Sequence, residues 1–279
     1  MNCWQQVVPR CTLLIALLVH AVASYSSPCA LEFPKLFSSA ECDEIVKAAA
    51  QMKRARATLL NANGVDSYMP LDRDGIVAWL PLGRFSRWRW VRMRMEQALT
   101  AGERAWQLSA DGLASNTDVQ VSTYPVGGHY TWHTDSEPPY GPVSAHQPTG
   151  GAEQWADKDR RVLSITVQLT PSEQYTGGQV ELAGHGNASV EQGTVIMFPS
   201  FLPHIVHPVT SGVRQSIVGW FKGEWAEKAA LDIRASIAFR TSSCAQQYVV
   251  KSQSCMVLTR FQQFCQAMCR LWGSGIAHR

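Results

Sequence analysis

Five residues between positions 133 and 214 have the types and the spacing of a metal site with an adjoining anion site. His133 and Asp135 lie two apart in a segment expected to be a β-strand, so both side chains should point to one side of it. A second imidazole comes from His204 or His207, and Arg214 follows at the start of another expected strand. Two histidines and one carboxylate leave three positions of a metal ion open, which suits a non-heme iron(II) oxygenase. The guanidinium of Arg214 can hold the far carboxylate of a cosubstrate through two parallel hydrogen bonds.

Each of these signals is weak by itself, because a His-x-Asp pair or a single arginine is most often a surface feature. Ser216 follows Arg214 by two residues and is expected on the same face of that strand, where its hydroxyl adds a hydrogen bond. His129 would share the face of His133, but a zinc-binding His-x-x-x-His pair needs a helix, which the glycines at 127 and 128 oppose. We interpret His129 as a surface residue or as one that supports a ligand.

The elements that must position these residues are short strands. Strands with a period of two, separated by glycine- and proline-rich turns, are expected at residues 118–124, 161–169, 179–182, 194–198 and 216–221. Two helices precede them, one beginning at Ser38, with Glu41 placed for a capping box, and one covering about 86–108. Residues 136–159 are rich in proline, glycine and serine and are expected to form a flap near the site. The pattern predicts a mainly β fold with flanking helices, a sandwich or jelly roll.

The first residues have the features of a secretory signal peptide. Arg10 precedes an apolar run at 11–19, and small residues follow at 21–23. The run is shorter than the roughly 20 residues that span a bilayer, although an uncleaved signal anchor or a buried core helix stays open. We therefore expect a signal peptide or anchor at 1–23, a catalytic domain at 28–224 and a cysteine-containing helical extension at 225–279. The expected location is the secretory pathway, in the endoplasmic reticulum lumen or outside the cell.

The cysteine content agrees with that location. Six of the eight cysteines remain after removal of 1–23, and an even number in an oxidising compartment indicates disulfides. Cys265 and Cys269 lie one turn apart, but no further ligand has a matching spacing, which disfavours a zinc site. Asn187 begins a glycosylation sequon. The net charge of +3, without a block of like charges, argues against nucleic acid as the main ligand.

The stretch from Leu31 to about Gly223 resembles the catalytic domain of the prolyl 4-hydroxylase family of iron(II)- and 2-oxoglutarate-dependent dioxygenases. The resemblance rests on the helix entry at 36–42, on Tyr124, Gly127, Tyr130, His133 and Asp135, on Arg161-Val-Leu-Ser164, on Gly177-Gly178-Gln-Val-Glu, and on His204, Pro208-Val209, Gly212, Arg214 and Trp220. It implies a double-stranded β-helix, the cupin-like jelly roll. It also implies Fe(II), 2-oxoglutarate and ascorbate as cofactors and a peptide or protein as the substrate.

The same resemblance assigns the site residues. The iron ligands would be His133, Asp135 and His204, because in this family the second histidine precedes the carboxylate-binding cation by ten residues. His207 would then be a pocket residue or a spare ligand. The 2-oxoglutarate contacts would be Arg214, Ser216, Tyr124 and Ser164. The substrate cleft would be shaped by Tyr130 and Trp220, unless these are plain core aromatics. Strict alternation places both tyrosines opposite His133, and a bulge at the glycine pair would turn Tyr124 inward.

Three departures from the family pattern weaken the case for proline as the substrate. Arg214 stands where the collagen-type enzymes commonly carry lysine, Ser164 where threonine is usual, and His207 where a small residue is usual. None of them removes the iron chemistry. We expect hydroxylation of a peptidyl proline. The alternatives are an oxygenase that acts on lysine or on a small molecule, and a non-catalytic jelly-roll scaffold, which should have lost a ligand or the arginine.

Overall fold

The computed structural model describes residues 28–60, 65–113, 118–136 and 161–225, and these belong to one compact unit. The predicted signal peptide, nearly all of the predicted flap and the C-terminal extension after residue 225 lie outside the described residues. So do Cys244, Cys255, Cys265 and Cys269. Within the described ranges, no helix is long and apolar enough to cross a membrane.

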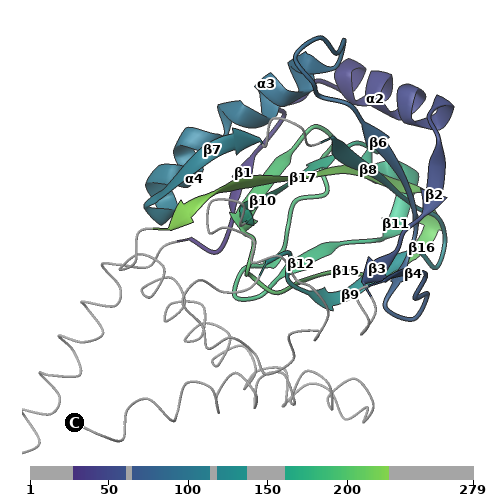
Figure 1. Cartoon of the computed structure of the whole chain (residues 1–279). Helices are drawn as coiled ribbons and strands as arrows, with labels where there is room; N and C mark the ends of the chain where they lie inside the picture. The colour runs from purple at the N-terminus through teal and green to yellow at the C-terminus, as the bar shows by residue number, and fades with distance from the viewer. Residues whose placement is uncertain (1–27, 61–64, 114–117, 137–160, 226–279) are drawn as a thin grey trace, which may run out of the picture. The chain divides into compact units, whose positions relative to one another are not determined.

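Two antiparallel sheets form the body of the molecule (Figure 1). The larger sheet has the order β1-β14-β10-β17-β8-β6-β2, and β7 also pairs with β17. The strands, in the same order and with β7 last, are Leu31–Phe33, Val195–Pro199, Arg161–Gln168, Arg214–Trp225, Val119–Tyr124, Ile76–Leu80, Arg54–Arg56 and Leu108–Leu113. The smaller sheet has the order β13-β12-β15-β9-β5 and consists of Gly186–Asn187, Val180–Leu182, His204–Val206, His129–His133 and Arg73–Asp74. Two short pairs complete the fold: β11 (Tyr175–Gly177) with β16 (Val209–Gly212), and β3 (Leu59–Leu60) with β4 (Asp66–Ser67). The predicted jelly roll is confirmed.

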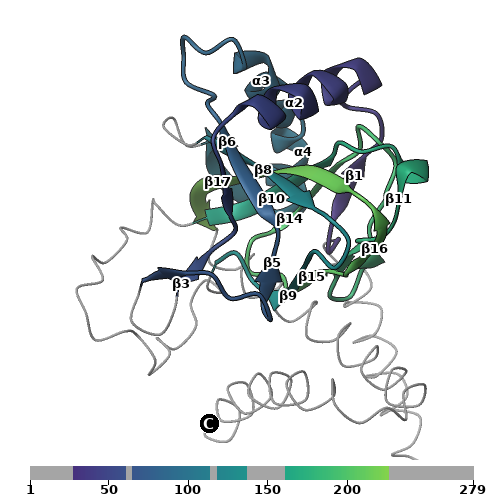
Figure 2. The same cartoon turned by 90° about the vertical axis from the view of Figure 1, so that its right-hand side faces the viewer.

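Three α-helices lie on one side of the larger sheet (Figures 1 and 2): α2 (Ser39–Gln51), α3 (Arg89–Gln97) and α4 (Leu99–Trp106). The predicted capping box is present, since the Ser38 hydroxyl accepts from the Glu41 amide and the Glu41 carboxylate accepts from the Ser38 amide. The prediction of one long helix over 86–108 is wrong. The chain breaks at Ala98, and Gln107, at a φ of +50°, ends α4 before β7 begins.

The five predicted strands are present, although β17 extends to twelve residues, from Arg214 to Trp225. Alternation along β10 separates two environments. Leu163 and Ile165 face the helices, where α4 comes so close that a Cβ on Gly102 would lie 3.1 Å from Leu163. Ser164 and Thr166 line a cavity between the two sheets instead. The apolar core therefore fills the space under the helices, and the polar row of the same strand faces the cavity.

Cys42 is a free thiol in the core, so the prediction that all six cysteines form disulfides is wrong for this residue. Its position on the inner face of α2 explains the difference, because its side chain is fully buried and its Sγ lies 3.8 Å from the Gln168 carbonyl oxygen. Burial also raises the pKa of the Cys42 thiol to about 12, so the thiol stays protonated and unreactive at neutral pH.

Candidate functional site

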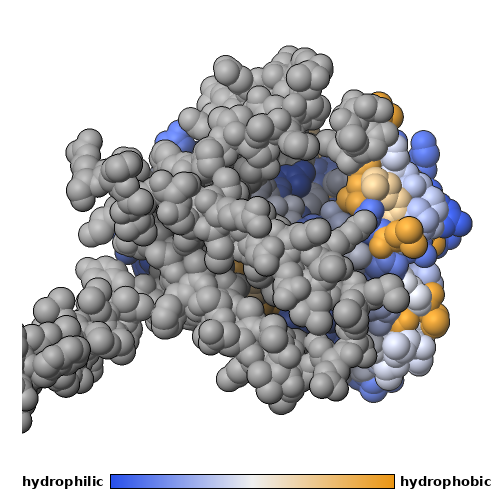
Figure 3. All heavy atoms as spheres, turned by 90° about the horizontal axis from the view of Figure 1, so that it is seen from below, coloured by the Kyte–Doolittle hydropathy of each residue, from blue (hydrophilic) through white to orange (hydrophobic). Residues whose placement is uncertain are grey.

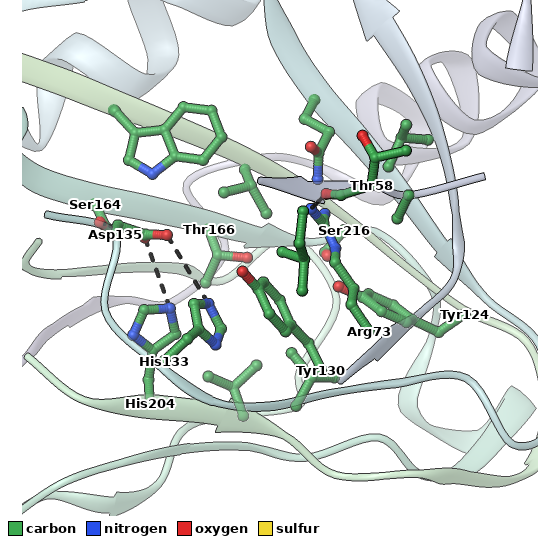
Figure 4. A pocket seen from close by; sticks show the side chains of 18 of the residues that line it. Thr58, Arg73, Tyr124, Tyr130, His133, Asp135, Ser164, Thr166, His204 and Ser216 are labelled. Atoms are coloured by element: carbon green, nitrogen blue, oxygen red, sulfur yellow. Dashed lines mark hydrogen bonds and ion pairs between the residues drawn. The ribbon is translucent and has the colours of Figure 1, made fainter. Parts of the chain in front are cut away.

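His133, Asp135 and His204 form a compact cluster in which the potential ligand atoms all lie within 4.8 Å of one another. The His133 Nε2 atom is 3.9 Å from one Asp135 carboxylate oxygen, and the His204 Nε2 atom is 3.6 Å from the other (Figure 4). Within the described ranges no other group of histidine, cysteine, aspartate or glutamate side chains converges in this way. We call these three residues the metal cluster.

Backbone pairing in the smaller sheet brings the cluster together. His204 on β15 lies directly opposite His133 on β9, so the two imidazoles share one face. Asp135 follows the end of β9, and its amide donates to the Ser200 carbonyl at 2.8 Å, which ties this residue to the turn before His204. The register shifts between the His204–His133 and Val206–Tyr130 pairs, which marks a bulge in β9.

That bulge corrects the expectation that Tyr130 faces away from His133. The two rings are stacked, with centroids 3.4 Å apart, and both line the cavity. Tyr124 also faces the cavity, but for another reason: it lies on β8 in the larger sheet, so its orientation is independent of the alternation in β9. Period-two reasoning fails across the turn because the chain changes sheets there.

The hydrogen bonds of the two imidazoles leave the nitrogens that face Asp135 available. The Nδ1 atom of His133 lies 2.8 Å from the Thr131 carbonyl, and the Nδ1 atom of His204 lies 2.9 Å from the Leu202 carbonyl. Because a carbonyl only accepts, each Nδ1 carries a proton, and Nε2 is the nitrogen of each ring that can bind a metal. Burial, helped by the charge of His204, lowers the pKa of His133 to about 3. The cluster is therefore ready to bind a metal ion at neutral pH without losing a proton from His133.

Asp135 is held in the ionised form. Burial alone would raise its pKa, but the neighbouring histidines and the Ser164 hydroxyl reverse the effect and lower it. The Ser164 Oγ donates to an Asp135 oxygen at 2.6 Å and lies 3.0 Å from the Ser200 Oγ. The indole N–H of Trp220 also favours the charged form, although its geometry falls short of a hydrogen bond. Ser164, which the resemblance assigns to 2-oxoglutarate, contacts the carboxylate of the metal cluster in this structure.

A buried cation lies in the same cavity. The Arg214 side chain is 1% exposed, and its Nη2 donates to the Gln168 amide oxygen at 2.9 Å. Its Nε and Nη1 atoms are buried without a hydrogen-bond partner, and so is the hydroxyl of Tyr175. Burial lowers the pKa of Arg214, whereas Tyr124 and Tyr175 oppose that shift, and the contact with the Tyr175 hydroxyl falls short of hydrogen-bond geometry. We call Arg214, Gln168 and Tyr175 the buried cation site.

The unpaired N–H donors of Arg214 fit an anionic ligand. Leaving a buried donor unpaired costs about 1–3 kcal/mol, and more when the donor is charged. A carboxylate in the cavity could accept a charge-assisted hydrogen bond from one of these unpaired nitrogens of Arg214. Gly178 keeps room for this side chain, since its backbone has a φ of +65° and a Cβ there would lie 2.9 Å from the Arg214 Cδ. The donor set of the metal cluster suits iron(II), and the buried cation site suits the distal carboxylate of 2-oxoglutarate.

The cavity that joins these groups has a volume of about 490 Å³. It is lined by the metal cluster and by Tyr124, Ser216, Tyr130 and Trp220. Its wall also includes Arg73 on β5 and Arg161 at the start of β10. In Figure 4, Tyr130 lies between the metal cluster and Arg73, and Ser216 lies beyond it near Arg73. Figure 3 shows hydrophilic residues deep in this face and hydrophobic residues exposed to one side of them.

The two remaining histidines of the sequence argument lie elsewhere. The Nε2 atom of His207 is 2.7 Å from a Glu181 carboxylate oxygen, and His207 is not on the cavity wall. His129 contacts the backbone carbonyl oxygens of Gly127 and Leu71. Of the two candidate second histidines, only His204 is in the metal cluster.

Four residues of the site were missed by sequence reasoning. Gln168 shares the strand face of Ser164 and Thr166, so the alternation of β10 held the signal. Tyr175 lies on a three-residue strand that has no pattern of its own. Ser200 acts mainly through its backbone, which a sequence pattern cannot reveal. Arg73 lies on a two-residue strand after a loop, where periodicity gives no information.

Comparison with known proteins agrees with this geometry. Residues 119–222 match the model of the 2OG-Fe(II) oxygenase superfamily. The chain is 33% identical over 107 residues to a PKHD-type hydroxylase of Synechococcus sp. (strain CC9902), covering 37% of this chain and 40% of the relative. It is 37% identical over 107 residues to a PKHD-type hydroxylase of Parvibaculum lavamentivorans, covering 37% of this chain and 41% of that relative. The chain thus spans about two fifths of the length of these relatives.

Among solved structures, a prolyl-4-hydroxylase of Pseudomonas putida has a TM-score of 0.50 and 18% sequence identity, covering 73% of this chain and 97% of the other. At this identity the match supports the fold. The matched segment 119–222 includes the whole metal cluster and Arg214.

Proposed function

Because this chain belongs to the 2OG-Fe(II) oxygenase superfamily, we propose that it hydroxylates a peptidyl proline and converts 2-oxoglutarate and dioxygen to succinate and carbon dioxide in the same reaction. One oxygen atom of dioxygen enters the new hydroxyl group and the other enters succinate. The observation that carries this proposal is one cavity that holds both the metal cluster and a buried arginine with two unpaired N–H groups.

His133, Asp135 and His204 would hold the iron, and Arg214 would hold the distal carboxylate of 2-oxoglutarate. Iron(II), when bound with this cosubstrate, supplies the oxidation that inserts oxygen into an unactivated C–H bond. The residues of the chain contribute position and charge. The two imidazoles would bind as neutral ligands, and the Asp135 carboxylate would contribute one negative charge. Ser164 fixes one oxygen of that carboxylate.

The buried cation site orients the cosubstrate from the opposite end. An unpaired N–H donor of Arg214 would pair with the carboxylate, and the Gln168 amide oxygen holds Nη2 in place. Tyr175 can add its hydroxyl to the same carboxylate, since that group is also unpaired. Burial of the whole site strengthens these contacts and keeps bulk water away from the reacting atoms.

Tyr130 and Trp220 support a peptide as the substrate. Burial raises the pKa of Tyr130 to about 12, so its hydroxyl stays protonated and can donate a hydrogen bond next to the metal cluster. The ring of Trp220 lies on the cavity wall. Flat aromatic walls suit a proline ring, and the resemblance to prolyl 4-hydroxylases favours that residue over lysine. Ascorbate as the reductant and the secretory pathway as the location are parts of the same proposal.

The test is succinate formation by purified protein with Fe(II), ascorbate and 2-oxoglutarate, with and without a proline-rich peptide. 4-Hydroxyproline in the recovered peptide is measured at the same time. We expect succinate and hydroxyproline in equal amounts, both absent from Asp135→Ala. Succinate without hydroxyproline would contradict the proline assignment and keep the oxygenase. No succinate from folded protein with bound iron would contradict the enzymatic proposal and favour the scaffold.

A further inference from the structure

Two arginines on the cavity wall differ from the other arginines with acidic neighbours in the described part of the chain. Arg94 pairs with Glu41 at 2.8 Å. Arg56, which also lines the cavity, donates to the Tyr68 hydroxyl at 2.6 Å and lies 4.0 Å from an Asp74 oxygen. By contrast, neither Arg73 nor Arg161 is paired with a carboxylate among the described residues. We call Arg73 and Arg161 the stacked arginines, because an aromatic ring supports each of them.

Arg73 is placed by strand pairing. It lies opposite Tyr130 in the β5–β9 pair, and its guanidinium carbon sits 4.7 Å from the centre of the Tyr130 ring. Its Nε is buried with no hydrogen-bond partner, and its Nη1 reaches the Thr58 carbonyl only at 3.5 Å, the long limit for a hydrogen bond. Stacking on the ring fixes the plane of the guanidinium and leaves its edge free for a ligand.

Arg161 is placed by the larger sheet. Its guanidinium carbon lies 3.9 Å from the centre of the Trp220 ring. Arg161 is exposed by surface area, but the protein around its guanidinium removes enough water to lower its pKa, and the charge of Asp135 counteracts that shift. Both stacked arginines also lower the pKa of Tyr130 against the larger effect of burial. Their charges are therefore felt at the same hydroxyl, next to the metal cluster.

The charges of the loaded site do not account for this pair. With iron(II) and 2-oxoglutarate bound, the charges of the metal, Asp135, Arg214 and the two cosubstrate carboxylates cancel. The stacked arginines then leave two positive charges on the wall. Asp66 is the one other carboxylate on the described wall, and it is exposed and pairs with neither arginine. Such a surface favours a ligand with negative charge and disfavours a cationic one.

We propose that Arg73 and Arg161 bind carboxylate side chains beside the hydroxylated residue, so that the substrate is an acidic peptide. This inference rests on the proposed function and adds a substrate class to it. A guanidinium on an aromatic face can donate two parallel hydrogen bonds to an Asp or Glu carboxylate, and an amide of the same shape cannot replace that carboxylate. A lysine beside the target residue would meet like charge instead.

The test measures binding separately from turnover. Full-length protein is loaded with Fe(II) and 2-oxoglutarate without oxygen and titrated against fluorescein-labelled heptapeptides with a central proline. One peptide has two Asp residues on each side of the proline, and its partner has Asn at the same positions. We expect the Asp peptide to bind at least about tenfold more tightly. The difference should shrink as sodium chloride rises from 50 to 500 mM, because salt screens partly exposed charges.

Matched variants identify the residues responsible. Arg73→Gln and Arg161→Gln should each reduce the preference for the Asp peptide severalfold. Arg87→Gln should leave it unchanged, since Arg87 makes the same kind of contact with Trp88, at 4.4 Å, but lies off the cavity wall. Thermal melting confirms that each variant is folded.

Equal binding of the two peptides, or binding of neither, would overturn the inference. So would a rise in the KM for 2-oxoglutarate in Arg73→Gln without a change in peptide affinity, since Arg73 would then serve the cosubstrate. If N-acetylaspartate displaced the peptide at equal affinity, the substrate would be a small acid, and the assignment of a peptide substrate would be overturned. Acidic preference without hydroxyproline in air would contradict the proposed reaction and leave this binding site intact.

Discussion

The buried cation site and the stacked arginines lie on the wall of one cavity and use the same side chain in opposite ways. Arg214 is 1% exposed, and its plane is set by the Gln168 amide and its buried surroundings. Arg73 and Arg161 are more accessible, and aromatic rings set their planes. The first arrangement suits one ligand of fixed shape, and the second suits ligands that vary around a common charge. We infer that the cosubstrate binds at the first and that substrate choice depends on the second.

The metal cluster should respond most strongly, because it would hold the iron that the proposed reaction needs. Asp135→Ala removes a ligand and the negative charge between two imidazoles. Metal affinity and succinate formation should therefore fall by more than ~100-fold, because replacing a residue that only supports a ligand already costs up to about that much. Iron binding followed by calorimetry and succinate release measure the two effects. Asp111→Ala, on an exposed position of β7, is the control. Retained iron affinity in Asp135→Ala would remove this residue from the cluster.

Arg214→Gln tests the buried cation site. Losing a charge-assisted hydrogen bond and the buried positive charge should raise the KM for 2-oxoglutarate roughly 50-fold and leave iron affinity within about twofold. Arg214→Lys should recover part of the loss, since it keeps the charge but not the paired geometry. If Arg73→Gln has the larger effect on this KM, the assignment of the two arginine sites is reversed.

Protonation of His133 distinguishes the metal cluster from both arginine sites, because the arginines keep their charge over the same pH range. The pKa of His133 is lowered from its usual value of 6.5 to about 3, so the unfolded chain binds more protons between these values. Stability that is fully present above about pH 6.5 is therefore lost as the pH falls toward 3. We expect metal-free protein to lose about 2 kcal/mol of unfolding free energy between pH 7.5 and 5 from this residue. Urea unfolding of the protein and of His133→Gln measures it, and an equal pH dependence in both would contradict the lowered pKa.

Ser164→Ala should have a smaller effect. The Asp135 carboxylate would lose one hydrogen bond, and metal affinity should fall about tenfold, as for other residues that support a ligand. Ser164→Thr, the residue usual in the prolyl 4-hydroxylase family, should restore most of it. A change in the KM for 2-oxoglutarate with unchanged metal affinity would return Ser164 to the cosubstrate site, as the resemblance implied.

His207→Gln should have the smallest effect, within about twofold in metal affinity and turnover. Its partner is Glu181, outside the cavity, and a partly exposed pair of this kind contributes little. His204→Gln is the matched variant and should behave like Asp135→Ala. Loss of iron binding in His207→Gln would contradict the cluster described here.

The sequence predicted the buried part of the site better than its accessible part. The His-x-Asp spacing of His133 and Asp135 indicated a metal site, and the resemblance selected His204, which precedes Arg214 by ten residues. Arg73 was not predicted, because a two-residue strand has no period and its role comes from pairing with Tyr130 on β9. The helix break at Ala98 and the end of α4 at Gln107 were not predicted either, and β7, which follows, pairs with the distant strand β17.

The twelve residues of β17 set a fixed separation within the cavity. This strand carries Arg214 at its start and, six residues later, Trp220, on which Arg161 stacks, a span of ~20 Å along the backbone. One hydrogen-bonded strand in the middle of a sheet cannot stretch, and a one-residue insertion would turn its side chains to the opposite face. The strand therefore acts as a spacer with a built-in length. Evolution of a new substrate in this scaffold would have to change the side chains at the ends of the spacer and not the distance between them.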